Sequence, residues 1–296
     1  MFFGVRKNFK IKNSIIKQKA EEASMNQSLK AAVYGLAVAD ALGVPYEFLT
    51  RGSFKAIEMV GYGSHQQPAG TWSDDTSLVL ATCDSIREKG KIDPVDMQQR
   101  FKHWLFEGAY TPDGLTFDVG NATREALTRG HGLSDEYSNG NGSLMRILPL
   151  AFTEASPSDI EAVSSITHAH ATSVEACQLY VDIARRLLKG QQLPEILSCL
   201  ETSTTYARLQ TLAELTEDDI RSTGYVVDTL EAALWCLLTS TSYPGTVLKA
   251  VNLGDDTDTV AAVAGGLAGI IYGLEGIPDN WLAQLRHKEL LESCLF

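Results

Sequence analysis

The stretch GDDTDTVAAVAGGLAGIIYGL, residues 254–274, does most to decide the fold. It opens with carboxylates and hydroxyls and continues as a run of small and aliphatic residues. Asp, Ser and Thr are favoured at a helix N-terminus, where they cap backbone N–H groups and suit the positive end of the helix dipole. The stretch therefore predicts a helix that starts at the acidic cluster. Its apolar part, residues 260–274, is too short to indicate a transmembrane helix.

A second acidic cluster opens another apolar run much earlier in the chain. TWSDDTSL (71–78) places Ser73, Asp74 and Asp75 at the start of SLVLATCDSI (77–86). One capping residue would explain a single acidic side chain at each helix start. Adjacent carboxylates repel one another unless a cation or a proton intervenes. Capping and metal binding both remain open for either cluster, and the presence of two clusters favours one shared binuclear site.

Helical spacing of apolar residues dominates the rest of the chain. From Leu29 onward apolar side chains recur on one face, and alternation typical of strands is scarce. Glycines stand where such helices would stop and prolines where new ones would start, namely Gly90, Gly190 and Gly273, and Pro94, Pro157, Pro194 and Pro278. We therefore predict an all-α fold, a single compact multi-helix domain over residues 25–296.

Composition and charge exclude several classes of function. The 296 residues are 44% hydrophobic and carry a net charge of -12, which repels nucleic-acid phosphates and anionic lipid. We expect neither nucleic acid nor membrane as a partner. The five cysteines are widely spaced and lack metal-binding spacing, and the N-terminus has no continuous apolar segment of a signal peptide. These features favour a reduced, cytoplasmic protein.

Residues 1–24 differ in charge from the remainder of the chain. Six Lys/Arg against two Glu give this segment a net charge of +4, and the residues after it sum to -16. We interpret residues 1–24 as a basic N-terminal arm. The arm is either a plain extension or a segment that docks on an acidic cleft of its own domain or of a partner.

Two further acidic residues are candidates for the site. Asp40 falls on the apolar stripe of the first expected helix, where an unpaired carboxylate is costly. It is either a buried residue satisfied by backbone donors or a carboxylate that supports substrate binding. Glu47 follows the Gly43-Val44-Pro45 break, so we expect it on a loop.

Six segments together resemble the ADP-ribosylglycohydrolases, a family that includes the dinitrogenase reductase-activating glycohydrolases. They occur in the family's order, and Ala39 and Ser73 are their only notable departures from it. The segments are AVADALGVPYEF (37–48), TWSDDTSL (71–78), NGNGSLMRILPLA (139–151), THAHATSVEA (167–176), GYVVDTLEAALW (224–235) and AVNLGDDTDTVAAVAGGLAGIIYG (250–273).

The resemblance implies two divalent cations, Mg²⁺ or Mn²⁺, held between the acidic clusters. Their ligands would be Ser73, Asp74, Asp75, Asp256, Asp258 and Thr259. Oxygen ligands without His or Cys suit these ions. Around the metals, the resemblance and the positions just described imply substrate-binding roles for Asp40, Asn141, Gly142, Ser143, His170 and Tyr225. His170 is preferred to His168, and a core position is the alternative for Tyr225.

The implied activity is metal-dependent hydrolysis that removes ADP-ribose from a modified protein side chain, with ADP-ribosyl-arginine as the first choice. A water would attack the ribose C1″, with Asp75 or a neighbouring carboxylate accepting its proton and Glu47 acting as a gate or a base. One alternative is a hydrolase of another ADP-ribosyl linkage. Another is a binding or inhibitor protein that blocks an ADP-ribosyltransferase sterically. Such a toxin is the partner that the resemblance suggests for residues 1–24, and immunity to it would be the biological role.

Overall fold

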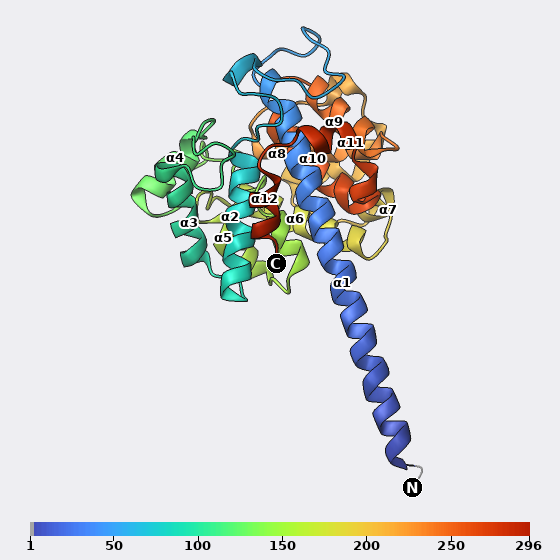
Figure 1. Ribbon diagram of the computed structural model, residues 1–296. Helices are drawn as coiled ribbons and strands as arrows, with labels where there is room; N and C mark the ends of the chain where they lie inside the picture. Colours follow the sequence, from blue (N-terminus) through green and yellow to red (C-terminus); the bar gives the residue numbers. More distant parts are fainter. Residues whose placement is uncertain (1–2) are drawn as a thin grey trace.

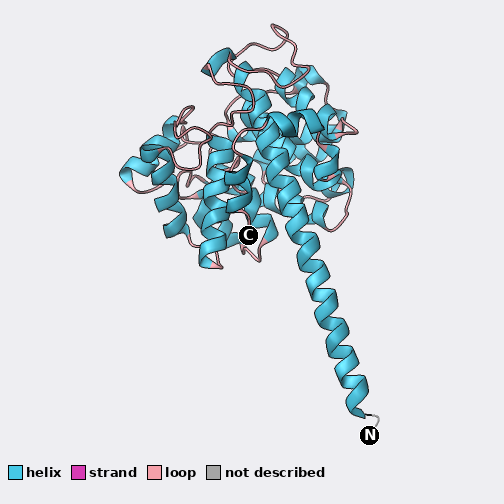
Figure 2. Cartoon of the chain, in the orientation of Figure 1, coloured by secondary structure: helices cyan, strands magenta, loops and turns pink. Residues whose placement is uncertain are grey.

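The computed structural model of the chain describes the backbone of residues 3–296 and the side chains of residues 23–296. Within this part of the chain, helices and loops make up the structure, and the only β contacts are isolated bridges (Figure 2). The predicted all-α fold is confirmed. The α-helices are α1 (Phe3–Gly43), α2 (Asp74–Lys89), α3 (Pro94–Glu107), α4 (Asn121–Arg129), α5 (Pro157–Ser164), α6 (Ala171–Leu188), α7 (Leu193–Ser198), α8 (Val226–Leu238), α9 (Tyr243–Asn252), α10 (Thr257–Tyr272), α11 (Asp279–Gln284) and α12 (Lys288–Cys294).

Short 3-10 helices complete the connections. They are η1 (Val44–Tyr46), η2 (Gly63–His65), η3 (Leu148–Phe152), η4 (Thr204–Glu214), η5 (Glu217–Asp219) and η6 (Leu274–Gly276). Several helix ends match the sequence signals. Gly90, with φ of 63°, follows the last residue of α2, and Gly273 follows α10. Pro94 and Pro157 are the first residues of α3 and α5, where proline's missing N–H costs no helical hydrogen bond.

Helix α10 lies at the centre of the molecule, packed along α1 (Figure 1). It also contacts α6, α8 and α9, and every residue from Thr257 to Gly269 is buried. The two helix backbones approach so closely that a Cβ added at Gly265 would lie 2.5 Å from the carbonyl oxygen of Gly35. The glycines and alanines of residues 260–269 therefore serve a close helix–helix contact, which brings the start of α10 against the end of α1.

The other acidic cluster lies at the start of helix α2. Helix α2 packs against α1, α3 and α12, and in Figure 1 it lies on the opposite side of α1 from α9 and α11. Its residues from Asp74 to Cys83 are all buried. The N-termini of α2 and α10 thus meet inside the domain, next to the end of α1.

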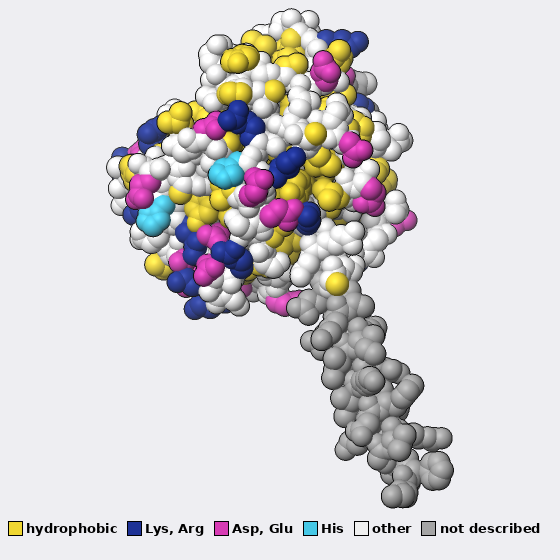
Figure 3. Space-filling view, viewed as in Figure 1, with side chains coloured by type: hydrophobic (Ala, Val, Ile, Leu, Met, Phe, Trp, Pro, Cys, Tyr) yellow, Lys and Arg dark blue, Asp and Glu magenta, His cyan; other side chains and the backbone are white. Residues whose placement is uncertain are grey.

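The surface, the cysteines and the start of helix α1 each relate to an expectation from the sequence. The face shown in Figure 3 mixes Lys and Arg with Asp and Glu side chains. The described helices include none that is both long and apolar enough to cross a membrane. All five cysteines are free thiols, and four of them are buried. Helix α1 runs through residue 24, the expected end of the basic arm, and the side chains of residues 1–22 lie outside the described part of the chain.

Candidate functional site

The two acidic clusters predicted from the sequence lie side by side. Ser73 is the N-cap of α2, and Asp256 is the N-cap of α10. Asp75 Oδ2 accepts hydrogen bonds from Ser73 Oγ at 3.1 Å and from Thr259 Oγ1 at 3.2 Å. The positive ends of two helix dipoles therefore face one group of carboxylates.

Several carboxylate oxygens of this group are buried and unpaired. Among the described residues, Asp75 Oδ1, Asp256 Oδ1 and Asp258 Oδ2 have no hydrogen-bond partner. Ligand atoms of Asp40, Asp75 and Asp258 lie within 4.8 Å of one another, and so do those of Glu47, Asp256 and Asp258. Buried carboxylates are costly unless they are paired or coordinate a metal. The residues present therefore fit divalent cations, which would bind these orphaned oxygens.

Burial and mutual repulsion disfavour the ionised form of the same carboxylates. Burial, followed by the neighbouring carboxylates, raises the pKa of Asp74, Asp75 and Asp258 well above the usual range. Burial raises the pKa of Asp40 to about 6, against hydrogen bonds that lower it. The cluster is thus a high-energy arrangement of charges that protons or cations would relieve.

Asp40 holds the start of α2 in place. Its carboxylate accepts from Ser73 N at 2.9 Å, from Thr76 N at 3.0 Å and from Thr76 Oγ1 at 2.6 Å. The side chain is fully buried and does not line the cavity of about 320 Å³ next to the acidic cluster. The arrangement agrees with the reading of a buried Asp satisfied by backbone donors, and it places Asp40 beneath the acidic cluster.

Glu47 lies directly after η1, as expected from the Pro45 break, but its side chain is buried. It bonds to Nε2 of His65, which belongs to η2. Burial raises the pKa of Glu47 to about 7, opposed by the hydrogen bond from His65 and reinforced by Asp118 and Asp256. The hydrogen bond to Glu47 raises the pKa of His65.

Sequence reasoning missed His65 and Asp118. Ligand atoms of both lie within 4.8 Å of one in Glu47. Asp118 lies between α3 and α4 with a φ of 50°, a conformation uncommon for a residue other than glycine. It stands alone in TFDVGNAT (116–123), with neither a second acid nor an apolar helical run directly behind it. The sequence signal that marked the other carboxylates is therefore absent here.

A cavity of about 320 Å³ opens above the acidic cluster. Its lining includes Glu47, Asp74, Asp118, Asp256 and Thr259, and also residues 140–142 and His168. Asn141 contacts the acidic residues directly, because its Nδ2 donates to Asp256 Oδ2 at 2.8 Å. Carboxylates and a glycine-rich loop thus line one space suited to a small polar ligand.

Other predicted residues lie outside this cavity. Ser143 is buried behind the loop, where its hydroxyl contacts Ser164. His170 caps α6 by accepting from Thr172 N, and the cavity lining includes His168 in its place, so the preference for His170 is not supported by this geometry. Tyr225 is 43% exposed at the start of α8, so the core alternative for this residue is wrong.

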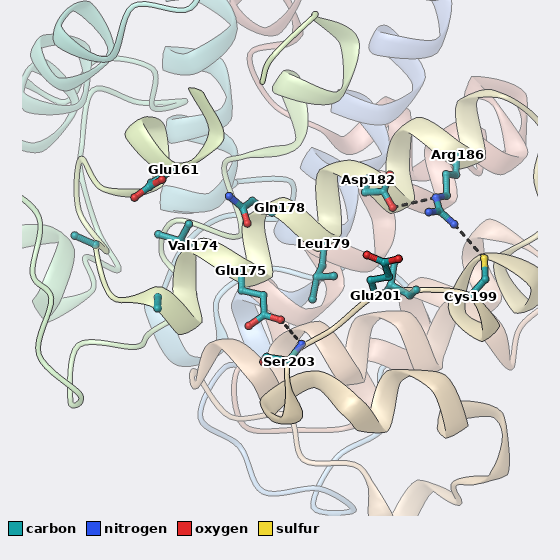
Figure 4. Close-up of a pocket in the computed structure, with 13 residues that line it drawn as sticks. Glu161, Val174, Glu175, Gln178, Leu179, Asp182, Arg186, Cys199, Glu201 and Ser203 are labelled. Carbon is teal, nitrogen blue, oxygen red and sulfur yellow. Dashed lines mark hydrogen bonds and ion pairs between the residues drawn. The ribbon is translucent and has the colours of Figure 1, made fainter. Parts of the chain in front are cut away.

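A larger cavity of about 770 Å³ lies between α6 and residues 199–203 (Figure 4). Its charged side chains are at least partly exposed, and three of them bond to other residues of the lining. Arg186 pairs with Asp182 at 3.0 Å, and Glu175 accepts from Ser203 N at 2.7 Å. This cavity lacks the buried, unpaired carboxylates that distinguish the acidic cavity.

Comparison with known proteins identifies the family of the chain. The model of the ADP-ribosylglycohydrolase family matches residues 21–295. The ADP-ribosylarginine hydrolase Tri1 of Pseudomonas putida is 38% identical over 90% of this chain and 77% of its own length. The ADP-ribosyl-[dinitrogen reductase] glycohydrolase of Rhodospirillum rubrum is 32% identical over 90% of this chain and 92% of its own.

A solved structure shows the same fold. It is described as an ADP-ribosylglycohydrolase-related protein complex, and it superposes with a TM-score of 0.78 at 33% identity, covering 92% of this chain and 96% of its own. The family match spans both acidic clusters, the 140–142 loop and the helices that bring them together. The chain belongs to the ADP-ribosylglycohydrolase family and is a hydrolase of ADP-ribosyl glycosidic bonds.

Proposed function

We propose that the protein removes ADP-ribose from modified arginine side chains of proteins, using two divalent cations, Mg²⁺ or Mn²⁺. The observation that carries the proposal is the convergence of Asp75, Asp256 and Asp258, each with a buried carboxylate oxygen that lacks a partner among the described residues. The similarity to a relative named ADP-ribosylarginine hydrolase supports arginine as the linked side chain.

The proposed cation ligands come from the starts of α2 and α10. They are Ser73, Asp74, Asp75, Asp256, Asp258 and Thr259. Divalent cations held there would supply Lewis-acid stabilisation and would lower the pKa of the attacking water. With cations bound, the carboxylates would be ionised, because the charges that now repel one another would each have a partner.

The protein's own groups account for the remaining steps. Cleavage of the bond at the ribose C1″ builds positive charge on the sugar, which the acidic wall of the cavity stabilises. The water oxygen bonds to C1″ as the bond from C1″ to the arginine nitrogen breaks, and Asp75 or a neighbouring carboxylate accepts the water's proton. The arginine side chain leaves as a guanidine and takes up a proton to become guanidinium. Glu47, whose pKa is raised to about 7 by burial in the metal-free site, is the proposed gate or base. In the same cavity, Asn141, Gly142 and His168 would position the ADP-ribosyl group.

The direct test is incubation of the purified protein with an arginine-ADP-ribosylated protein, with and without Mg²⁺ or Mn²⁺, followed by measurement of free ADP-ribose. Matched samples carry ADP-ribose on serine or as an O-linked ester. Release from arginine that requires the cation supports the proposal. Release from another linkage alone would assign that linkage to this site, and release that survives chelation would contradict the role of the metal.

We also propose that residues 1–24 serve recognition of an ADP-ribosyltransferase and thereby protection against such a toxin. The net charge of +4 in this segment, against -16 for the rest, supports docking on an acidic cleft. The family match begins only at residue 21. Deletion of residues 1–24 should leave hydrolysis intact and weaken capture of a cognate transferase, more so at low salt. Equal capture by both forms would reduce the segment to a plain extension.

A further inference from the structure

Arg146 is a fully buried arginine that the proposed reaction does not use. Its guanidinium stacks over the ring of Phe101, 4.6 Å from the centroid. Nη2 donates to Thr167 Oγ1 at 2.9 Å and to Val163 O at 3.1 Å, while Nε and Nη1 lack partners among the described residues. Burial lowers the pKa of Arg146 to about 10, so it is still a cation near neutral pH. A buried cation is costly unless other groups bond to it, and Thr167 is one of the few groups that bond to Arg146.

Thr167 connects Arg146 to the cavity. Its hydroxyl oxygen lies 2.9 Å from Nδ1 of His168, the histidine that lines the cavity wall. His168 is held in place on two sides, because its backbone N–H donates to Ser164 O and a Cβ added at Gly142 would lie 2.8 Å from its Cε1. Among the described residues, no group bonds to its Nε2. That nitrogen is left for a ligand.

The direction of the hydrogen bonds follows from the chemistry of the three groups. A guanidinium only donates, so Thr167 Oγ1 accepts from Arg146. In the described part of the chain, the other side-chain hydrogen bond of Thr167 Oγ1 is to Nδ1 of His168, which can accept the hydroxyl proton. If Nδ1 carried a proton instead, both groups would donate to Oγ1, and the buried hydroxyl proton would have no acceptor. Nδ1 is therefore unprotonated, and Nε2 carries the proton.

The charge state of His168 agrees with this arrangement. Burial, followed by the nearby Arg146 cation, lowers the pKa of His168 to about 3, so the ring is neutral near neutral pH. Cys177 on α6 is also buried, and burial raises the pKa of its thiol, so the thiol is neutral as well. A neutral ring has one N–H to donate, and the hydrogen bond to its other nitrogen determines where that N–H is.

We propose that Arg146 and Thr167 are positioning residues that fix His168 as the Nε2–H tautomer, which donates a hydrogen bond to an oxygen of the ligand in the acidic cavity. The ligand's identity as an ADP-ribosyl group rests on the proposed function, and the tautomer does not. The N–H at Nε2 of His168 favours a ligand that places a hydrogen-bond acceptor next to it. It disfavours a ligand that places a donor there, because two donors cannot bond to each other. His168 thus offers the ligand a hydrogen-bond donor whose position is fixed.

The tautomer can be measured directly. The protein contains six histidines, and His168→Gln assigns the signals of His168 in a ¹⁵N spectrum of histidine-labelled protein. We expect a protonated-type Nε2 and an unprotonated-type Nδ1 in the ligand-free wild type. Thr167→Val keeps the shape and removes the hydroxyl, so it should shift the population toward the Nδ1–H form. Thr167→Ser should retain the wild-type pattern.

Binding of ADP-ribose to the metal-loaded protein supplies the second readout. Thr167→Val should weaken binding about tenfold, the loss expected when one buried hydrogen bond is misdirected, and Thr167→Ser should not. Thr246→Val is the matched control, because Thr246 on α9 is equally buried but bonds to the carbonyl oxygen of Ser242, far from His168 in the sequence. Its tautomer and affinity should match the wild type.

Three outcomes distinguish failure of the tautomer inference from failure of the proposed function. An Nδ1–H tautomer in the wild type would overturn the inference, and so would a Thr167→Val protein with unchanged tautomer and unchanged affinity. A wild type with the Nε2–H tautomer, which Thr167→Val shifts, in protein that neither binds nor releases ADP-ribose would count against the proposed function and leave the positioning role of Thr167 supported.

Discussion

Thr259 Oγ1 donates a hydrogen bond to Asp75 Oδ2 at 3.2 Å, which joins two residues that are 184 positions apart in the sequence. The bond links the first turn of α10 to the first turn of α2. Because Asp74 and Asp75 in α2 and Asp258 in α10 are all buried, these carboxylates share one environment with little access to solvent. Any change at one cluster is therefore expected to affect the other.

Asp258→Asn should abolish most of the hydrolysis. The substitution keeps the size of the side chain and removes a carboxylate whose Oδ2 has no partner among the described residues. We expect a loss of about a hundredfold or more, roughly 2.7 kcal/mol in the barrier, and the same loss in wild type treated with EDTA. Free ADP-ribose released per unit time is the measurement. Asp182→Asn on the surface of α6 is the control, and full activity in the Asp258 variant would contradict the metal site.

Glu47→Gln should impair turnover more than folding. The variant loses the charge that faces Asp118 and Asp256, and the side chain keeps a group that can bond to His65. We expect at least about tenfold slower hydrolysis, about 1.4 kcal/mol, with little change in the melting temperature of the metal-loaded protein. Glu58→Gln, on the exposed part of the same segment, is the control. Wild-type kinetics in the Glu47 variant would remove this residue from the mechanism.

Metal-free protein should lose stability as the pH rises. Burial raises the pKa of Glu47 to about 7 in the folded state, above that of an unfolded glutamate. The stability contributed by its protonated form is fully present below the unfolded pKa, near pH 4, and is lost as the pH rises through about 7. The melting temperature of EDTA-treated protein should therefore fall between about pH 5 and about pH 8.

The same series has an internal control. Glu47→Gln should flatten the upper part of this decline, because the amide does not titrate. Saturating Mn²⁺ should restore the melting temperature at high pH, since cations stabilise the ionised carboxylates. A melting temperature that rises steadily over this range in metal-free protein would show that the buried carboxylates do not dominate.

Arg51→Ala should destabilise the segment that carries Asp256. Arg51 donates to Leu253 O at 2.8 Å, to Glu217 O at 2.7 Å and to Ile220 O at 2.6 Å. Removing the guanidinium leaves these carbonyls without their shared donor, and we expect a loss of about 2 kcal/mol in the free energy of unfolding.

Denaturant unfolding measures that loss. The exposed Arg221→Ala is the matched control from the same region and should change stability by less than about 0.5 kcal/mol. Activity should fall with stability in the Arg51 variant, because Leu253 lies close before Asp256 in the chain. Equal unfolding midpoints for the two variants would show that the three bonds contribute nothing net.

The helices and the acidic helix starts were predictable because their causes are local. Capping residues, the spacing of apolar side chains and the glycine and proline signals act within a few residues, and they indicated α2 and α10 correctly. The pairing of the two clusters was predicted from the repulsion of adjacent carboxylates and from the family resemblance. The burial of the Glu47 side chain was not, because a loop position in the sequence says nothing of what packs against it.

By itself the sequence determined the all-α fold and the identity of the carboxylates that open α2 and α10, since both follow from interactions within single helices. The tertiary structure alone decided that His65 and Asp118 join Glu47, that His168 lines the cavity in place of His170, and that Tyr225 is exposed. Asp118 carries no local motif, and His168 and His170 belong to the same short segment. Their roles depend on which loops pack together across the chain, which is a long-range property that no short stretch of sequence encodes.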